Sequence, residues 1–169
     1  MRAIILAGGR GTRLRPFTAS FPKPLVPVGD TPVVELLIKS LLRHGIYDVT
    51  LSLGYLAELV QAYFQHRQRL LTKLNLTYVL EEQPSGTAGS LALVEGLNDT
   101  FLVMNGDLLT NLNFDSLLKF HNEHSSLATM CVREHEYRVP YGVIESDGQR
   151  VRSMVEKPTS SGVDVSSTT

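Results

Sequence analysis

The opening of the chain gathers positive charge and glycine in one short stretch. Residues 1–29 hold five Lys or Arg residues and no Asp or Glu, although the whole chain is nearly neutral, with 16 basic and 17 acidic residues. These cations surround Gly8, Gly9 and Gly11, which follow the apolar run 3–7. Glycine lets backbone N–H groups approach a ligand closely, and the cations neutralise its charge. This combination predicts a loop that binds a polyphosphate.

The glycine loop matches neither of the two common nucleotide-binding patterns. It lacks the third glycine of the dinucleotide fingerprint, and no Gly-Lys-Ser/Thr follows it as in a Walker A loop. The absence of acidic side chains from residues 1–29 nevertheless favours a ligand-binding loop over a simple turn.

Carboxylates follow two further apolar runs. Glu81 follows the run 76–80, and Asp107 follows the run 101–104. In an α/β sheet ligands bind beyond the carboxyl ends of the strands, so both acids are expected beside the glycine loop. A lone carboxylate beside a polyphosphate is a usual way to hold Mg²⁺, which shares the phosphate oxygens as ligands. We therefore predict that Asp107 binds Mg²⁺ rather than capping a helix.

The segment from Glu81 to Gly89 is open to two interpretations. It places carboxylates before a glycine turn and before small residues that open a helix. It could be a solvated loop with a helix cap. It could equally be a pocket for a flat base, in which Gly86 allows close approach and a carboxylate accepts base N–H bonds. The residue types alone favour neither interpretation.

Strand and helix patterns alternate along the chain. Apolar runs predict strands, and periodic patterns predict helices. The strands are expected over 3–7, 49–53, 76–80, 101–104, 127–133, 141–145 and 151–155, and the helices over 31–44, 56–70, 87–97 and 114–123. The later strands are closer together, as in a mixed or antiparallel edge. The order predicts a three-layer α/β/α fold, with helices on both faces of a mixed, mainly parallel sheet.

Local signals set the expected ends of the first helix. Asp30 or Thr31 is the expected N-cap, Pro32 suits the first turn, and Gly45 is expected to end the helix.

Length and composition limit the number of domains and the classes of protein to which the chain can belong. At 169 residues the chain is one domain or most of one, with a core over 1–158 and a Ser/Thr-rich tail over 159–169 that we expect to be disordered or poorly packed. Near-neutral charge argues against a general nucleic-acid binder. No apolar run is long enough for a membrane span or a secretory leader. The one cysteine, Cys131, is expected to be buried in a strand. A single cysteine allows no internal disulfide, which fits the reducing cytoplasm.

Six short motifs together resemble, in order and spacing, those of the sugar-1-phosphate nucleotidyltransferases. They are Leu6–Pro16, Pro22–Pro27, Gly86–Gly89, Asn105–Asp107, Tyr141–Val143 and Glu156–Pro158. The resemblance implies a Rossmann-like, glycosyltransferase-A-like core. It also implies the reaction of an NTP with a sugar 1-phosphate to give an NDP-sugar and pyrophosphate, with Mg²⁺ as the cofactor. Such chemistry requires charge neutralisation and positioning more than acid–base catalysis.

The resemblance also implies a role for individual residues. Arg13 would hold the β- and γ-phosphates, Lys23 would sit at the reacting phosphates, and Asp107 would bind Mg²⁺. Lys157 would grip the sugar phosphate, with Glu156 and Gly142 toward the sugar. The residues expected to bind the nucleotide are Leu6, Ala7, Gly8, Gly9, Gly11, Thr12, Glu81, Gly86 and Thr87.

The nucleobase is predicted from Glu81, which lies five residues before Gly86, where uridylyl and thymidylyl members tend to carry Gln. A carboxylate cannot donate to a pyrimidine O4, but it can accept from both N1–H and N2–H of guanine. This points to GTP and to a mannose- or heptose-like sugar phosphate, as in a mannose-1-phosphate guanylyltransferase. Gln83 nearby keeps UTP and dTTP as alternatives.

Two segments of the family pattern are missing after Pro158. The family usually continues with an Asn-Ala-Gly segment and a later Gly-Tyr-Trp-x-Asp-type segment, whose Asp is the second metal ligand. We therefore expect a truncated or naturally short form, for which a homo-oligomer is left open. Two alternative functions remain. One is a nucleotide-binding regulatory module without turnover, and the other is a nucleotidyltransferase for a phosphate acceptor that is not a sugar phosphate.

Overall fold

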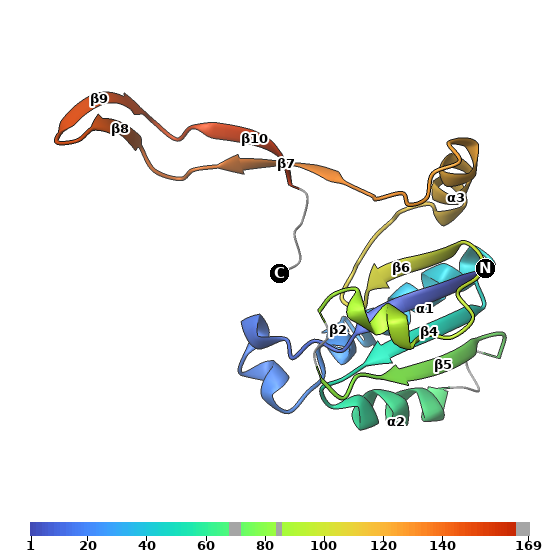
Figure 1. The fold of residues 1–169 in the computed structure, drawn as a ribbon. Helices are drawn as coiled ribbons and strands as arrows, with labels where there is room; N and C mark the ends of the chain where they lie inside the picture. The colour runs from blue at the N-terminus through green and yellow to red at the C-terminus, as the bar shows by residue number, and fades with distance from the viewer. Residues whose placement is uncertain (68–71, 84–85, 165–169) are drawn as a thin grey trace. The chain divides into compact units, whose positions relative to one another are not determined.

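The computed structural model describes residues 1–67, 72–83 and 86–164. Its centre is a four-stranded sheet in the order β5-β4-β1-β6 (Figure 1). The strands are β1 (Arg2–Ala7), β4 (Asp48–Leu53), β5 (Asn75–Leu80) and β6 (Phe101–Asn105). Every neighbouring pair runs parallel, so the carboxyl ends of all four strands lie along the same edge of the sheet.

Helices and short turns connect these strands. The α-helices are α1 (Val33–Arg43), α2 (Ala57–Arg67) and α3 (Phe114–Glu123). The described residues also form the 3₁₀ turns η1 (Thr12–Leu14), η2 (Phe17–Ala19), η3 (Lys23–Leu25) and η5 (Gly89–Leu93). The short strands β2 (Pro27–Val28) and β3 (Thr31–Pro32) pair antiparallel just before α1. None of the helices among the described residues is long and apolar enough to cross a membrane.

The two faces of the sheet differ because side chains alternate along each strand. Ala3, Ile5 and Ala7 of β1 join one apolar cluster with alternate residues of β4, and α1 and α2 supply Ile38, Leu41, Val60 and Phe64 to it. The intervening residues of β4, Thr50 and Ser52, are also buried but are polar. The first face therefore holds the core, while the second face buries hydroxyl groups.

The local sequence signals predict the end of α1 correctly and its start incorrectly. The predicted end at Gly45 is confirmed: Gly45 has φ +71°, and the N–H groups of Gly45 and Ile46 donate to Leu42 O and Leu41 O at 3.1 and 3.0 Å. This is a Schellman motif, which satisfies the last carbonyls of the helix. The predicted N-cap is wrong, because no side chain caps the helix and Pro32 is the residue that precedes its first turn.

A buried acid ties α1 to α2. Glu35 on α1 is 2% exposed, pairs with Lys39 at 2.7 Å, and accepts a hydrogen bond from Tyr63 on α2. Burial by itself raises the pKa of Glu35, but the hydrogen bonds from Lys39 and Tyr63 and the charges of Lys39 and Arg67 bring the pKa below 4.5. Burial and the bond to Glu35 raise the pKa of Tyr63 to about 12.

The chain divides into two units, and the second begins at His124. In this unit β7 (Arg133–Arg138) pairs antiparallel with β10 (Thr159–Asp164), and β8 (Val143–Asp147) pairs antiparallel with β9 (Arg150–Val155). The predicted mainly parallel α/β class is confirmed. The antiparallel strands, however, form separate two-stranded ribbons instead of extending the central sheet of the described residues.

Several predicted elements differ from the structure. The helix expected over 87–97 is only the 3₁₀ turn Gly89–Leu93. The strand expected over 127–133 is wrong, because the first strand there starts at Arg133 and Cys131 is exposed. Residues 159–164 of the expected disordered tail form β10 instead. The last three residues of the helix expected over 56–70 lie outside the described residues.

The Glu35 cluster generates a prediction about acid stability. A carboxyl whose pKa is lowered by folding adds stability above its ordinary pKa, and this stability is lost as the pH falls through the lower value. The wild type should therefore lose free energy of unfolding as the pH drops below 4.5. Glu35→Gln should cost about 1–3 kcal/mol at neutral pH and flatten this dependence.

Urea unfolding at neutral pH and in acid measures both effects. Glu58→Gln, which changes an exposed acid on α2, is the matched control and should keep the wild-type profile. An unchanged acid profile in Glu35→Gln would show that the Glu35 carboxylate does not contribute this stability.

Candidate functional site

The backbone packs tightly at the carboxyl end of β1. A Cβ on Gly54, which follows β4, would lie 2.9 Å from the carbonyl oxygen of Gly8. A Cβ on Gly106, which follows β6, would lie 3.1 Å from Leu6 O, and the Gly106 N–H donates to the same oxygen at 2.8 Å. A Cβ at Gly54 would clash with backbone and one at Gly106 would be in tight contact, so glycine at both positions favours the close approach of the three strand ends.

The glycine loop after β1 packs against Thr18 and Lys23. Gly11 has φ +61°, and a Cβ there would lie 2.9 Å from Thr18 Cγ2 and 3.2 Å from Lys23 Cβ. Thr18 is buried, and its hydroxyl donates to Gly11 O at 2.6 Å. The loop is thus folded around Thr18, and its compact turn carries Lys23.

Lys23 and Asp107 are brought together although 84 positions separate them in the sequence. Lys23 Nζ lies 2.5 Å from Asp107 Oδ2, and both side chains are partly exposed, at 34% and 41%. Exposed pairs of this kind contribute little to stability. The pair therefore matters more for where it lies, which is at the ends of β1 and β6, than for the stability it provides.

Glu81 lies directly beyond β5 and turns toward β1. Its N–H continues the ladder by donating to Leu53 O at 2.8 Å, and its Oε1 accepts a hydrogen bond from the Ser52 hydroxyl at 2.8 Å. The same Oε1 would lie 3.0 Å from a Cβ on Gly8. The carboxylate is therefore adjacent to the glycine that the sequence predicts to line a nucleotide.

The other predicted residues of the first unit lie around this edge. Leu6 and Ala7 end β1, Thr12 and Arg13 are exposed on η1, and the exposed Gly86 and Thr87 precede η5. Gly9 is exposed, and a Cβ there would meet no atom within 4 Å. The edge combines backbone N–H groups and cations with carboxylates on either side.

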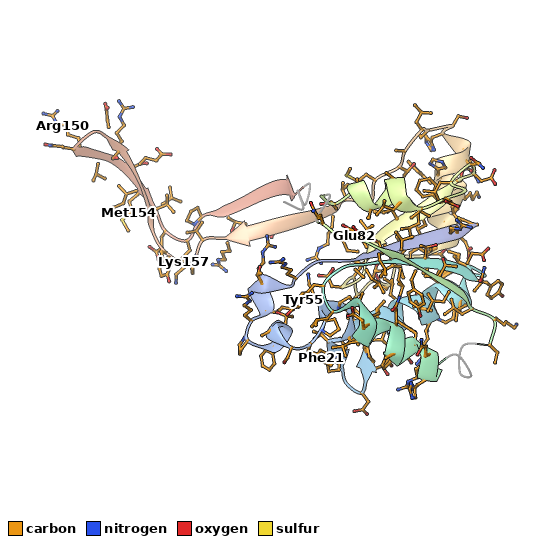
Figure 2. All side chains as sticks on the ribbon, turned by 60° about the horizontal axis from the view of Figure 1, so that its bottom comes forward. Phe21, Tyr55, Glu82, Arg150, Met154 and Lys157 are labelled. Carbon is orange, nitrogen blue, oxygen red and sulfur yellow. The ribbon has the colours of Figure 1, made fainter. Side chains whose placement is uncertain are left out.

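The predicted sugar-phosphate residues lie in the second unit. Gly142 faces Glu156 across the ribbon, since a Cβ on Gly142 would lie 3.0 Å from Glu156 Oε2 and 2.6 Å from Met154 Cε. Lys157 is exposed in the turn after β9, with φ +46° (Figure 2). The structure thus brings Gly142 and Glu156 together within this unit.

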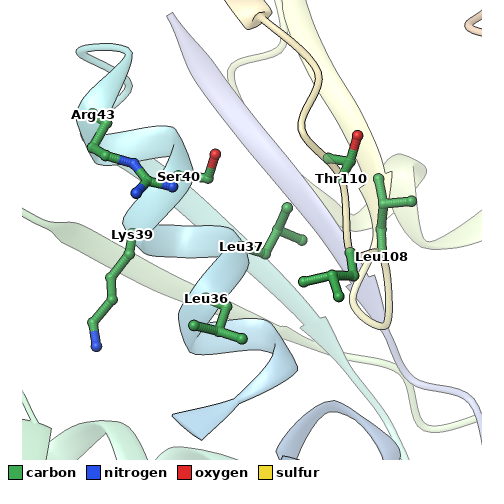
Figure 3. Close-up of a pocket in the computed structure, with 8 residues that line it drawn as sticks. Leu36, Leu37, Lys39, Ser40, Arg43, Leu108 and Thr110 are labelled. Atoms are coloured by element: carbon green, nitrogen blue, oxygen red, sulfur yellow. The ribbon is translucent and has the colours of Figure 1, made fainter. Parts of the chain in front are cut away.

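A separate pocket lies between α1 and the segment that follows Asp107. Figure 3 shows Leu37, Lys39 and Arg43 along α1 on one side of it and the segment with Leu108 and Thr110 on the other. None of the predicted site residues lines this pocket.

Sequence reasoning missed the residues that support the site. Thr18, Ser52, Gly54 and Tyr55 hold the loops rather than face a ligand. The Tyr55 hydroxyl donates to Ala19 O at 2.5 Å and its N–H to Gly8 O at 3.3 Å, which fixes the loop near Phe21 (Figure 2). One signal was available: Thr50 and Ser52 are polar residues inside an otherwise apolar buried strand.

A parallel sheet with a glycine loop, a cation and carboxylates at its strand ends is typical of nucleotide-binding α/β proteins. The comparisons with known proteins narrow this class. The family model described as nucleotidyl transferase matches residues 2–168. The chain belongs to this family, whose members generally use a divalent metal ion.

Curated relatives are identical to the chain at more than a third of the aligned positions. The catalytic subunit beta of mannose-1-phosphate guanylyltransferase from Danio rerio is 39% identical over 165 residues, which cover 94% of this chain and 45% of the relative. A probable mannose-1-phosphate guanylyltransferase 1 from Oryza sativa subsp. japonica is 38% identical with the same coverage. The chain thus spans less than half the length of these relatives.

Solved structures agree with the fold. HddC from Yersinia pseudotuberculosis, complexed with GMP-PN, aligns with a TM-score of 0.63 at 25% identity over 95% of this chain and 72% of that chain. A putative glucose-1-phosphate thymidylyltransferase from Bacillus anthracis gives a TM-score of 0.63 at 26% identity over 96% and 68%.

The packing around Gly8 generates a prediction. Gly54→Ala would force a methyl group against the Gly8 carbonyl, so we expect a loss of about 1–3 kcal/mol in the free energy of unfolding. Urea denaturation measures this loss. Gly9→Ala is the matched control for stability because its methyl would meet no atom within 4 Å. Equal stability of Gly54→Ala and wild type would contradict the tight contact.

Proposed function

We propose that this chain contributes the nucleotide-binding core of a sugar-1-phosphate nucleotidyltransferase. In this proposal it binds GTP and transfers GMP to a sugar 1-phosphate, releasing pyrophosphate. The observation that carries the proposal is the meeting of Lys23 and Asp107 beside the glycine loop. Residues 1–158 are taken as the core, and the proposed setting is the cytoplasm because the single cysteine allows no internal disulfide.

The loop and its cations suit the phosphates. The N–H groups of Gly8, Gly9 and Gly11 would face the nucleotide, and Arg13 would neutralise the β- and γ-phosphates. Lys23 would stabilise the charge that develops as the α-phosphorus is attacked. Groups that are already aimed at developing charge are an effective source of rate enhancement.

Asp107 suits a divalent cation, for which we propose Mg²⁺. No group of three or more His, Cys, Asp or Glu that could hold a metal gathers within the described ranges. A single carboxylate is sufficient for Mg²⁺, which keeps several waters and takes substrate phosphates as further ligands. When bound, the metal would neutralise phosphate charge, while Asp107 holds it at the end of β6.

Glu81 suits guanine. Its carboxylate lies beside Gly8 and could accept both N1–H and N2–H of the base. Uracil and thymine offer one donor flanked by two carbonyl oxygens, which a carboxylate repels. The relatives named mannose-1-phosphate guanylyltransferase and the solved complex with GMP-PN support the same choice of base.

The sugar phosphate is proposed to bind through the second unit. Lys157 would grip the phosphate, and the small Gly142 beside Glu156 would leave space for the sugar. The names of the relatives support a mannose-like sugar, and the heptose-like alternative comes from the sequence alone.

A pyrophosphate-release screen of the four ribonucleotides and dTTP against sugar 1-phosphates, with Mg²⁺, tests the proposal. Release with GTP and a mannose-like 1-phosphate is expected. Nucleotide binding without any pyrophosphate release would indicate a binding module instead. Release with an acceptor other than a sugar phosphate would indicate a different nucleotidyltransferase.

The metal site generates a prediction. Mg²⁺ should increase the affinity of the wild type for GTP by about tenfold or more, and Asp107→Asn should abolish this increase. Even changes to residues outside the ligand shell of a metal site lower metal affinity by about tenfold or more. Calorimetric titration with GTP, with and without Mg²⁺, measures the effect. Asp99→Asn, at an exposed acid just before β6, is the control. An undiminished Mg²⁺ effect in Asp107→Asn would place the metal elsewhere.

The base site generates a second prediction. The wild type should bind GTP more tightly than UTP or dTTP by about tenfold or more, because a pyrimidine leaves the Glu81 carboxylate repelled. Glu81→Gln should reduce this preference. Competition among the nucleotides, followed by calorimetry, measures it. Equal or tighter binding of UTP or dTTP would make Gln83 the better candidate for reading the base.

A further inference from the structure

Ser52 is a fully buried polar residue at the end of β4, with 0% exposure. Its hydroxyl donates to Glu81 Oε1 at 2.8 Å, across the space between β4 and the segment beyond β5. Hydrogen bonds to an ionised acceptor are about twice as strong as those between neutral groups. The bond therefore favours one orientation of the Glu81 carboxylate.

A second hydroxyl on the same face of β4 provides a comparison. Thr50 lies one pleat earlier, is 3% exposed, and bonds to the Thr77 hydroxyl at 2.9 Å. That bond joins two strands inside the sheet. Ser52 instead bonds to Glu81, which lies beyond β5 at the carboxyl edge of the sheet. The Thr50 hydroxyl therefore joins two strands, whereas the Ser52 hydroxyl orients a side chain of the candidate site.

The position of Glu81 shows what the bond achieves. The backbone of Glu81 is fixed by its N–H bond to Leu53 O, but a glutamate side chain keeps several rotatable bonds. The bond from Ser52 holds Oε1 next to Gly8, within 3.0 Å of the place where a Cβ would stand. The carboxylate is thus already oriented before a ligand arrives, which reduces the entropy lost on binding.

We propose that Ser52 is a positioning residue for nucleobase selection, acting through Glu81. Ser52 does not touch the base. It fixes the carboxylate at the distance and angle at which guanine can donate two hydrogen bonds, so that base discrimination depends on a buried hydroxyl on the neighbouring strand. This inference rests on the proposed role of Glu81 in reading the base.

The test compares the ratio of the dissociation constants for UTP and GTP in matched variants of the whole chain. Ser52→Ala should lower this ratio by about threefold to tenfold, an effect on the order of one ordinary hydrogen bond, because the variant still carries the Glu81 carboxylate but no longer orients it through the hydroxyl. Thr50→Ala also removes a buried hydroxyl from the same face of β4, and it should leave the ratio unchanged. Adding Ser52→Ala to Glu81→Gln should change the ratio little further, because Ser52 acts through Glu81.

The outcomes separate this inference from the proposed function. A wild type without guanine preference overturns the base-reading role of Glu81. A wild type with guanine preference and an unchanged ratio in Ser52→Ala overturns the role of Ser52 alone. Equal losses in Ser52→Ala and Thr50→Ala would assign the effect to general packing and also overturn it. If Ser52→Ala does not fold, Ser52→Cys takes its place, and its weakly donating thiol should still lower the ratio.

Discussion

The site depends on one constraint, which is that three strand ends meet at Gly8 and its neighbours with no room for side chains. A methyl group on the Gly54 Cα would touch the Gly8 carbonyl oxygen, and the Gly106 N–H donates to Leu6 O. Through these contacts the loop after β4 and the loop after β6 are fixed to the glycine loop after β1. The acids that follow β5 and β6 are consequently held close to a cation and to backbone N–H groups. Glycine is required here for space, which only a residue without a Cβ provides.

One face of the sheet mainly stabilises the fold, and the other face mainly positions residues of the site. The apolar face packs α1 and α2 against the strands, and the Glu35 cluster joins those helices. The other face buries hydroxyls, of which the Ser52 hydroxyl reaches the strand-end edge. A site built on strand ends and supported by a second layer of hydrogen bonds is more accurately positioned than one built on free loops. The family relationship and this geometry support the same nucleotide chemistry.

Much of the first unit could be predicted from the sequence, and the reasons are specific. β1 is recognisable as a short apolar run and β4 as an apolar run interrupted by Thr50 and Ser52, and α3 was predicted with its observed bounds. The placement of Glu81 and Asp107 at the same carboxyl edge of the sheet followed from parallel order alone. The link between Lys23 and Asp107 could not be derived, since it depends on how η1 to η3 fold around Thr18. The strand expected over 127–133 was wrong because an apolar, β-branched composition does not by itself provide a strand to pair with. Pairing with β10 begins only at Arg133. The role of Ser52 could not be predicted because its hydrogen-bond partner, Glu81, is 29 positions away in the sequence.

The central claim is that the nucleotide binds at the carboxyl edge of the central sheet. The most direct measurement is a titration of the isotope-labelled chain with GTP and Mg²⁺, followed through backbone amide chemical shifts. The account predicts that the amides of Gly8, Gly9, Gly11, Glu81 and Asp107 shift together, with one dissociation constant. Shifts confined to the pocket between α1 and residues 108–110, with these five amides unmoved, would contradict it.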